Sequence, residues 1–171
     1  CLTISLDNYY KERDQAPLGS DGLPDLECLE ALNTDQFNRQ MHALAAGETV
    51  RLPVFDFTLG KQVPGPEVCL APDQVLLVEG IHGLNERLSA SIPQAQKYKI
   101  YVSALTQLNM DEHNRIPTTD TRLIRRLVRD ARTRGSSVQE TLSMWPSVRV
   151  GEKRHIFPHQ ERADIMFNSA L

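Results

Sequence analysis

Hydrophobic and polar residues follow one another with the periods of strands separated by helices. Short apolar runs at 74–80 ("QVLLVEG"), 98–104 ("YKIYVSA") and 163–169 ("ADIMFNS") have the length of buried strands, and the chain opens in a similar run, "CLTISL". A helix is expected from about 34 to 46, with Thr34 as its cap and Gly47 at its end. The alternation predicts an α/β fold with an open, mainly parallel sheet flanked by helices.

The remaining segments predict loops and one further helix. "VRLPVFDF" at 50–57 is typical of a short extended piece, and "TLGKQVPGPEV" at 58–68 of a turn-rich connection. Ser137 and Glu140 have the spacing of a capping box, which predicts that a helix begins there. Pro146 should kink or interrupt that helix, because proline has no backbone N–H to donate.

Six arginines crowd the segment 121–135, "TRLIRRLVRDARTRG". At about 100° per residue, five of them fall within one third of a helix circumference, and the apolar residues of the segment fall opposite. The arginine side holds Arg122, Arg125, Arg126, Arg129 and Arg132, and the apolar side holds Leu123, Ile124, Leu127, Val128 and Ala131. We therefore expect an amphipathic helix that rests on its apolar side and presents guanidinium groups to an anion.

Composition indicates one globular domain. The chain has 171 residues, of which 40% are hydrophobic and 24% charged, enough for a single core. Three cysteines, Cys1, Cys28 and Cys69, lie far apart, which favours neither a disulfide framework nor a zinc site and suggests a reducing cytoplasm. No apolar run reaches the roughly 18 to 20 residues that span a bilayer, so we expect a cytoplasmic protein without a membrane partner.

The charge is unevenly distributed along the chain. Residues 1–114 hold 8 Lys and Arg against 16 Asp and Glu, whereas residues 115–162 hold 11 against 5, in a chain of net charge -3. A dedicated nucleic-acid binder is usually basic overall, so the pI of about 6.0 favours a small polyanion as the arginine partner. An RNA- or tRNA-binding module or a regulatory module stays open as the alternative, as does a homo-oligomer.

Two carboxylates are expected at the carboxyl ends of predicted strands, where open α/β sheets bind their ligands. Asp7 follows "TISL" and Glu79 follows "VLLV". Together with the arginine helix they make up the set that phosphoryl transfer needs. One carboxylate takes the proton of an acceptor hydroxyl, another holds Mg²⁺, and guanidiniums neutralise the transferred group.

Four motifs in order resemble those of uridine kinases and their phosphoribulokinase-like relatives. They are "SLDNYY" at 5–10, "LPVFDF" at 52–57, "LLVEGIHGL" at 76–84 and the lid-like "DTRLIRRLVRDARTRG" at 120–135. The closest resemblance is to a bacterial nucleoside kinase branch whose members often carry a threonyl-tRNA-synthetase-like region. It implies one P-loop-kinase-like domain over 1–171 in which 115–160 form an arginine-rich lid region, with ATP and Mg²⁺ as cofactors.

The resemblance also implies roles for individual residues. Catalysis would fall to Asp7, Arg122, Arg126 and Arg129, and the acceptor side to Tyr9, Glu27, Phe55 and Arg134, while Arg125 would face ATP and Glu79 would hold Mg²⁺. The implied reaction transfers the γ-phosphoryl group of ATP to the 5′-hydroxyl of a uridine- or cytidine-like nucleoside. Glu27 and Phe55 replace the family's usual Asp and Tyr, so a kinase of another small alcohol or sugar phosphate stays open.

The family's phosphate-binding loop, G-x-x-x-x-G-K-[ST], does not occur in the chain. In the family this loop lies just before the strand that resembles "CLTISL". We therefore expect the first strand, the phosphate loop and the first helix to precede Cys1 in the complete protein, and we expect residues 1–171 alone to be inactive.

Overall fold

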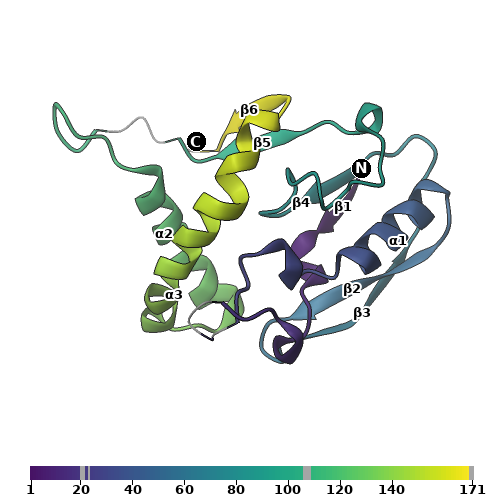
Figure 1. The fold of residues 1–171 in the computed structure, drawn as a ribbon, viewed down its shortest axis with the longest axis horizontal. Coiled ribbons are helices and arrows are strands. Elements are labelled where there is room, and N and C mark those ends of the chain that lie inside the picture. The colour runs from purple at the N-terminus through teal and green to yellow at the C-terminus, as the bar shows by residue number, and fades with distance from the viewer. Residues whose placement is uncertain (20–21, 23, 106–108, 170–171) are drawn as a thin grey trace.

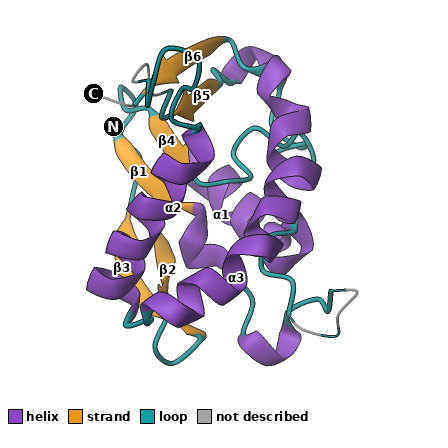
Figure 2. Cartoon of the chain, turned by 90° about the vertical axis from the view of Figure 1, so that its left-hand side faces the viewer, coloured by secondary structure: helices purple, strands orange, loops and turns teal. Residues whose placement is uncertain are grey.

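The computed structural model describes residues 1–19, 22, 24–105 and 109–169. Its sheets consist of three strand pairs (Figure 1). β1 (Leu2–Ser5) runs parallel to β4 (Leu76–Glu79), and β5 (Ile100–Ser103) runs parallel to β6 (Ile165–Asn168). These four strands confirm the predicted apolar runs. β1 and β4 lie between the β5–β6 pair and the third pair in two perpendicular views (Figure 2).

The third pair corrects the prediction for residues 58–68. β2 (Val50–Asp56) pairs antiparallel with β3 (Lys61–Val68), where the sequence suggested a turn-rich connection. The prolines of this segment misled the prediction, because a proline cannot donate a hydrogen bond to a neighbouring strand and so argues against a strand. Here Pro53 lies opposite Pro64 in a two-stranded ribbon whose register shifts beside Pro53, and such edges and bulges tolerate proline.

The hydrophobic core forms around β1, the 3₁₀ turn Leu6–Tyr9 that follows it, and α1 (Thr34–Ala45). Its buried members are Ile4, Leu6, Tyr9, Leu29, Leu32, Phe37, Met41, Leu44 and Leu88. The cap of α1 differs from the prediction, since the side chain of Asn33, not of Thr34, accepts the backbone N–H of Gln36 at 3.1 Å. The chain leaves the helix through Gly47, whose φ of 78° suits glycine.

Two helices lie side by side away from this core (Figure 1). α2 (Thr118–Arg129) continues into a π-helical turn, Asp130–Arg134, and α3 (Val138–Gly151) continues into another, Glu152–Ile156. The capping box is confirmed, because Ser137 and Glu140 exchange side-chain and backbone hydrogen bonds of 3.2 and 2.6 Å. Pro146 lies inside α3 and does not interrupt it, so the single lost hydrogen bond is tolerated.

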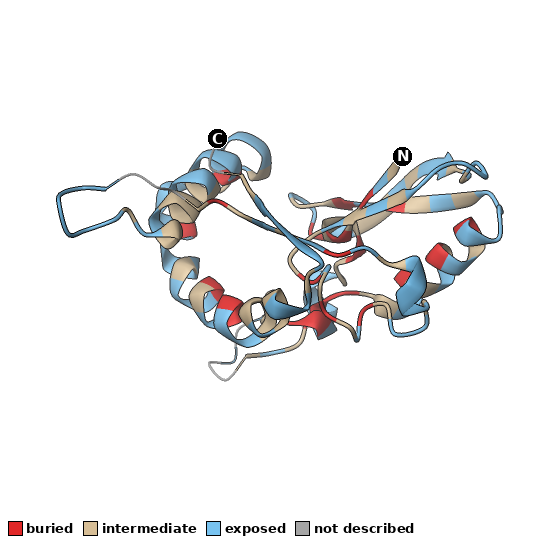
Figure 3. Ribbon diagram, turned by 90° about the horizontal axis from the view of Figure 1, so that it is seen from above, coloured by how far each residue is buried: buried red, intermediate tan, exposed pale blue. Residues whose placement is uncertain are grey.

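The predicted apolar floor of the arginine helix is only partly covered. No residue of α2 is buried, Ile124 and Val128 are 61% and 50% exposed, and Leu123 and Leu127 are half-buried. Figure 3 shows mostly exposed and intermediate positions along both helices. On the arginine side, Arg122 and Arg126 are also half-buried, because they pair with the carboxylates of Glu152, Glu27 and Asp130.

Among the described residues, no helix combines the length and apolarity that crossing a bilayer requires. Cys1, Cys28 and Cys69 are all free thiols.

Candidate active site

The two predicted carboxylates meet at one edge of the β1–β4 pair. Glu79 ends β4 in register with Ser5 at the end of β1, and Asp7 follows Ser5 in the 3₁₀ turn. Parallel strands bring their carboxyl ends to the same edge, as expected for the mainly parallel sheet that the sequence predicted. Both side chains retain access to solvent. Carboxylate oxygens of this kind are the protein ligands that Mg²⁺ prefers, and the edge fits the ion chemically.

Arg134, in the π-helical turn after α2, contacts Asp7, in the turn after β1. Its Nη2 donates to Asp7 Oδ2 at 2.7 Å, although 127 positions separate the two residues. The guanidinium also lies over the ring of Phe57, 4.2 Å from its centroid, a cation–π arrangement. The π-helical turn that carries Arg134 ends at Gly135, whose φ of 66° lets the chain reverse direction there. This contact joins the lid region to the end of β1.

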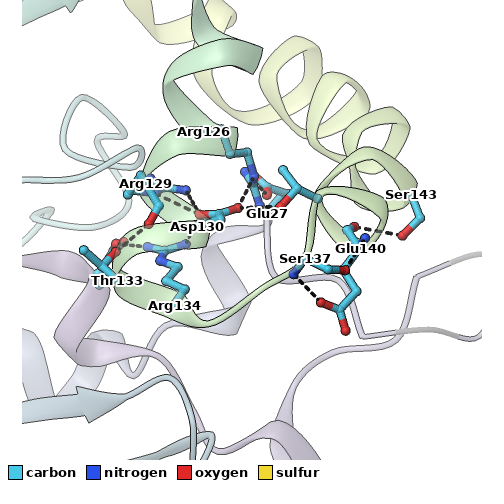
Figure 4. Close-up of polar contacts among 11 residues, drawn as sticks. Glu27, Arg126, Arg129, Asp130, Thr133, Arg134, Ser137, Glu140 and Ser143 are labelled. Carbon is cyan, nitrogen blue, oxygen red and sulfur yellow. Dashed lines mark hydrogen bonds and ion pairs between the residues drawn. The ribbon is translucent and has the colours of Figure 1, made fainter.

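Asp130 is the centre of the arginine cluster (Figure 4). It is 1% exposed, and its carboxylate oxygens lie 3.3 Å from Arg126 Nε, 3.0 Å from Arg129 and 4.0 Å from Arg134 Nη1. The hydroxyl of Thr141 on α3 donates to Asp130 at 3.4 Å. Arg126 and Arg134 stand four positions before and after Asp130, so the helical spacing places all three on one face. Asp130 therefore ties the arginines to each other and to α3.

Glu27, one of the predicted acceptor-side residues, forms an ion pair with Arg126. Arg126 Nη1 lies 3.7 Å from Glu27 Oε1. Burial raises the pKa of Glu27, and the positive charges of Arg126 and Arg122 oppose that rise. α3 approaches Glu27 so closely that a Cβ on Gly151 would stand 2.4 Å from Glu27 Cβ. Glycine at this position in α3 is what lets Glu27 lie under the arginine helix.

A second buried carboxylate, that of Glu152, pairs with an arginine in the first half of α2. Glu152 is completely buried, lies 2.5 Å from Arg122 and also pairs with Arg149. The whole cluster holds five guanidiniums and four carboxylates, a balance of +1 if all are ionised, from Arg122, Arg126, Arg129, Arg134 and Arg149 against Asp7, Glu27, Asp130 and Glu152. The arginines of this cluster are thus largely neutralised by the protein itself.

The predicted acceptor residues separate in the structure. Phe55 is buried and stands edge-on to Phe57, with ring centroids 5.1 Å apart, and to Tyr10 at 5.9 Å. Phe57 is the half-buried member that meets Arg134. Tyr9 is not brought to this group, because it is 1% exposed in the core and its hydroxyl donates to Gln40 at 2.7 Å.

Other lid arginines point elsewhere. Arg125 is exposed, and its Nη1 lies 3.4 Å from Ser169 Oγ, just after β6. Arg129 keeps about half of its side chain in solvent. A cavity of about 220 Å³ lies beside α2 and α3 at the β5–β6 pair, lined by Tyr101, Ser103, Leu105, Thr118, Thr119, Arg122, Arg149, Phe157, Gln160 and Met166. The lining offers four hydroxyls, together with two guanidiniums that both pair with Glu152.

Sequence reasoning missed Asp130, Glu152 and Phe57. Asp130 could have been found, because its spacing of four from both Arg126 and Arg134 is the spacing of intrahelical ion pairs. Glu152 stands three positions after Arg149, which is also an intrahelical spacing, but its pairing with Arg122 and the contact of Phe57 with Arg134 join residues distant in sequence.

The model of one protein family, described as Phosphoribulokinase / Uridine kinase family, matches residues 5–170. The chain belongs to this family. Among curated relatives, the uridine kinase of Chloroflexus aurantiacus is 29% identical over 165 residues, which cover 96% of this chain and 71% of that protein. The uridine kinases of Clostridium tetani and Bacillus pumilus are 27% and 28% identical with the same coverage.

A solved structure supports the fold. A protein described as a fructose transport system kinase, from Silicibacter sp. TM1040, superposes with a TM-score of 0.57 at 18% identity, covering 96% of this chain and 73% of that one. The α/β fold with parallel strands and flanking helices is therefore P-loop-kinase-like, as the sequence predicted, and the protein is a member of a kinase family.

Proposed function

We propose that the complete protein transfers the γ-phosphoryl group of ATP to the 5′-hydroxyl of a uridine- or cytidine-like nucleoside. The observation that carries this proposal is the contact between Asp7, at the end of β1, and Arg134 of the lid region, beside Glu79 at the same strand edge. This contact supports the proposal because a candidate proton acceptor touches a candidate phosphate-binding cation at the strand edge that also carries a candidate metal ligand. The names of the curated relatives support a nucleoside as the acceptor.

In this mechanism Asp7 accepts the proton of the acceptor hydroxyl as its oxygen attacks the γ-phosphorus, and the bond to the ADP oxygen breaks. The arginines of the lid region neutralise charge that develops on the phosphoryl oxygens, a role suited to the permanently charged guanidinium fork. Glu79 would hold Mg²⁺, directly or through water, and the ion would neutralise phosphate charge when bound.

On the acceptor side, the Glu27 carboxylate would accept hydrogen bonds from the ribose hydroxyls. The aromatic group of Phe55 and Phe57 would face the base. Phe55 supports the base through Phe57 in this proposal, because Phe55 itself is buried. Arg125 would face ATP from the exposed end of α2, near Ser169.

We propose that catalysis also needs a phosphate-binding loop carried by an additional parallel strand between the two parallel pairs. Within the described residues, β4 pairs only with β1 and β5 only with β6. Apolar side chains on these strands remain open, including Leu77 at 46% and Val102 at 58% exposure. One more strand would join the pairs into a continuous sheet and cover part of this surface. Residues 1–171 alone would then be inactive.

The test is a kinase assay of a longer protein that includes such a strand and loop. With Mg²⁺-ATP and a panel of nucleosides and sugars, the wild type should phosphorylate pyrimidine nucleosides. Asp7→Asn should lower kcat by about 10²- to 10⁴-fold, the usual contribution of a general base, with little change in ATP affinity. Asp120→Asn removes the same charge from the exposed start of α2 and should leave kcat unchanged. Near-normal turnover by Asp7→Asn would remove Asp7 from the mechanism.

RNA binding is the weaker alternative. Arg125, Arg129 and Arg132 are exposed, but Arg122 and Arg126 are paired with Glu152, Glu27 and Asp130, and the carboxylates Asp7 and Glu79 would repel a phosphate backbone. RNA binding by the wild-type chain that weakens steeply with salt would favour this alternative over the kinase.

A further inference from the structure

The carboxylates that pair with the lid arginines are of two kinds. Asp130 and Glu152 have side chains that are at most 2% exposed, so they are permanent counterions inside the protein. Asp7 and Glu27 have side chains that are 36% and 15% exposed, and they belong to the proposed acceptor side. Only this second kind can be reached by a ligand from solvent.

Arg134 has contacts that would persist without Asp7. Its Nη1 lies 4.0 Å from Asp130, and its guanidinium lies on the Phe57 ring. Among the partners that the described residues give Arg134, Asp7 is thus a partly exposed carboxylate, whereas Asp130 is buried. A guanidinium held in this way can exchange one oxygen ligand for another while it stays in place.

The Asp7 contact also has a cost for the proposed reaction. Asp7 Oδ2 accepts a hydrogen bond from Arg134 at 2.7 Å, and that bond competes with the hydrogen bond to an acceptor hydroxyl. An oligophosphate carries several negative charges and offers the same planar pair of oxygens that guanidinium prefers.

We infer that the Asp7–Arg134 ion pair is a displaceable contact, in which the Asp7 carboxylate occupies the place of a phosphate oxygen. Oligophosphate binding transfers Arg134 from Asp7 to the ligand and releases Asp7 for the acceptor hydroxyl. Donor binding thus activates the proton acceptor. This inference rests on the proposed function for its meaning, but its test does not depend on catalysis.

The test measures binding of inorganic tripolyphosphate to the 171-residue chain by isothermal titration calorimetry, without metal. Asp7→Asn removes the competing carboxylate and should bind tripolyphosphate about five-fold more tightly than the wild type, the size expected for one partly exposed ion pair. Asp120→Asn is the matched control for net charge and should change the affinity less than two-fold. Adding Arg134→Gln to Asp7→Asn should remove the gain. Circular dichroism verifies that each variant is folded.

Equal gains in Asp7→Asn and Asp120→Asn would overturn the inference, because net charge alone would then explain them. No gain in Asp7→Asn, or no tripolyphosphate binding by any variant, would overturn it as well. A second measurement uses only the wild-type chain. Tripolyphosphate should shift the carboxylate ¹³C NMR resonance of Asp7 in the wild-type chain and leave that of Asp120 in place, and an unmoved Asp7 resonance would contradict the displacement.

If the completed protein fails to phosphorylate nucleosides while Asp7→Asn still gains affinity, the proposed function fails and the displaceable contact stands. If turnover is observed without the affinity gain, the proposed function stands and the inference fails.

Discussion

His82 should make the stability of the protein depend on pH. The residue follows β4 and is 1% exposed, and its ring lies 6.3 Å from that of His155 on the π-helical turn after α3. Burial, and secondarily the charge of His155, lowers the pKa of His82 from 6.5 to about 4. Glu30 opposes this shift and His159 adds slightly to it.

The direction follows from proton binding in the two states. Between about pH 6.5 and pH 4 the unfolded chain binds a proton at His82 and the folded chain does not. Unfolding therefore takes up a proton in this window, and the free energy of unfolding falls as the pH falls. The pKa of His82 differs by about 2.5 between the unfolded and folded states, which lowers the free energy of unfolding by about 3 kcal/mol once the pH is below both values. About 2 kcal/mol of this loss falls between pH 7 and pH 5.

The measurement is urea unfolding at a series of pH values from 7 to 4.5, for the wild type and for His82→Gln. Other groups titrate in this range, and Glu30 and Glu86, whose pKa values are lowered by their hydrogen bonds, also lose stabilisation as the pH falls. His82→Gln retains those contributions, so the difference between the two proteins isolates His82. The difference should shrink by about 2 kcal/mol from pH 7 to pH 5. Parallel pH profiles would refute the reasoning.

Two further predictions concern stability. Glu152→Gln should lower the free energy of unfolding by about 1 to 3 kcal/mol, measured by urea unfolding, because Arg122 and Arg149, which are partly exposed, lose their fully buried counterion. A loss below about 0.5 kcal/mol would show that the pairing with Glu152 does not stabilise the protein. Ser137→Ala should cost about 1 kcal/mol in thermal unfolding, because the capping box of α3 is lost, and an unchanged melting temperature would show that tertiary packing alone holds the start of α3.

Local patterns in the sequence determined the elements and the strand-end carboxylates. Apolar runs predicted β1, β4, β5 and β6, and the Ser137–Glu140 spacing predicted the start of α3, because these signals depend on neighbours within a few positions. Parallel pairing then brought Asp7 and Glu79 to one edge. The order of motifs also predicted the family, which the family match confirms.

Proline content misled the prediction for β3, since the tolerance of Pro53 and Pro64 depends on a pairing that only the folded ribbon provides. The orientation of the arginine helix was missed for a related reason. Periodicity separates an apolar from a charged side, but it does not say which side turns inward. Burial normally favours the apolar side, and here the buried carboxylates of Asp130 and Glu152 also draw Arg126 and Arg122 into partly covered positions.

The sequence by itself thus determined the four parallel strands, the helices, the family and the chemical types at the site. Only the tertiary structure decided which charges distant in sequence pair. Arg134 meets Asp7 across 127 positions, Arg126 meets Glu27, and Gly151 allows α3 to approach Glu27. Ion pairs between distant segments depend on distance and burial, and both quantities exist only once the chain has folded.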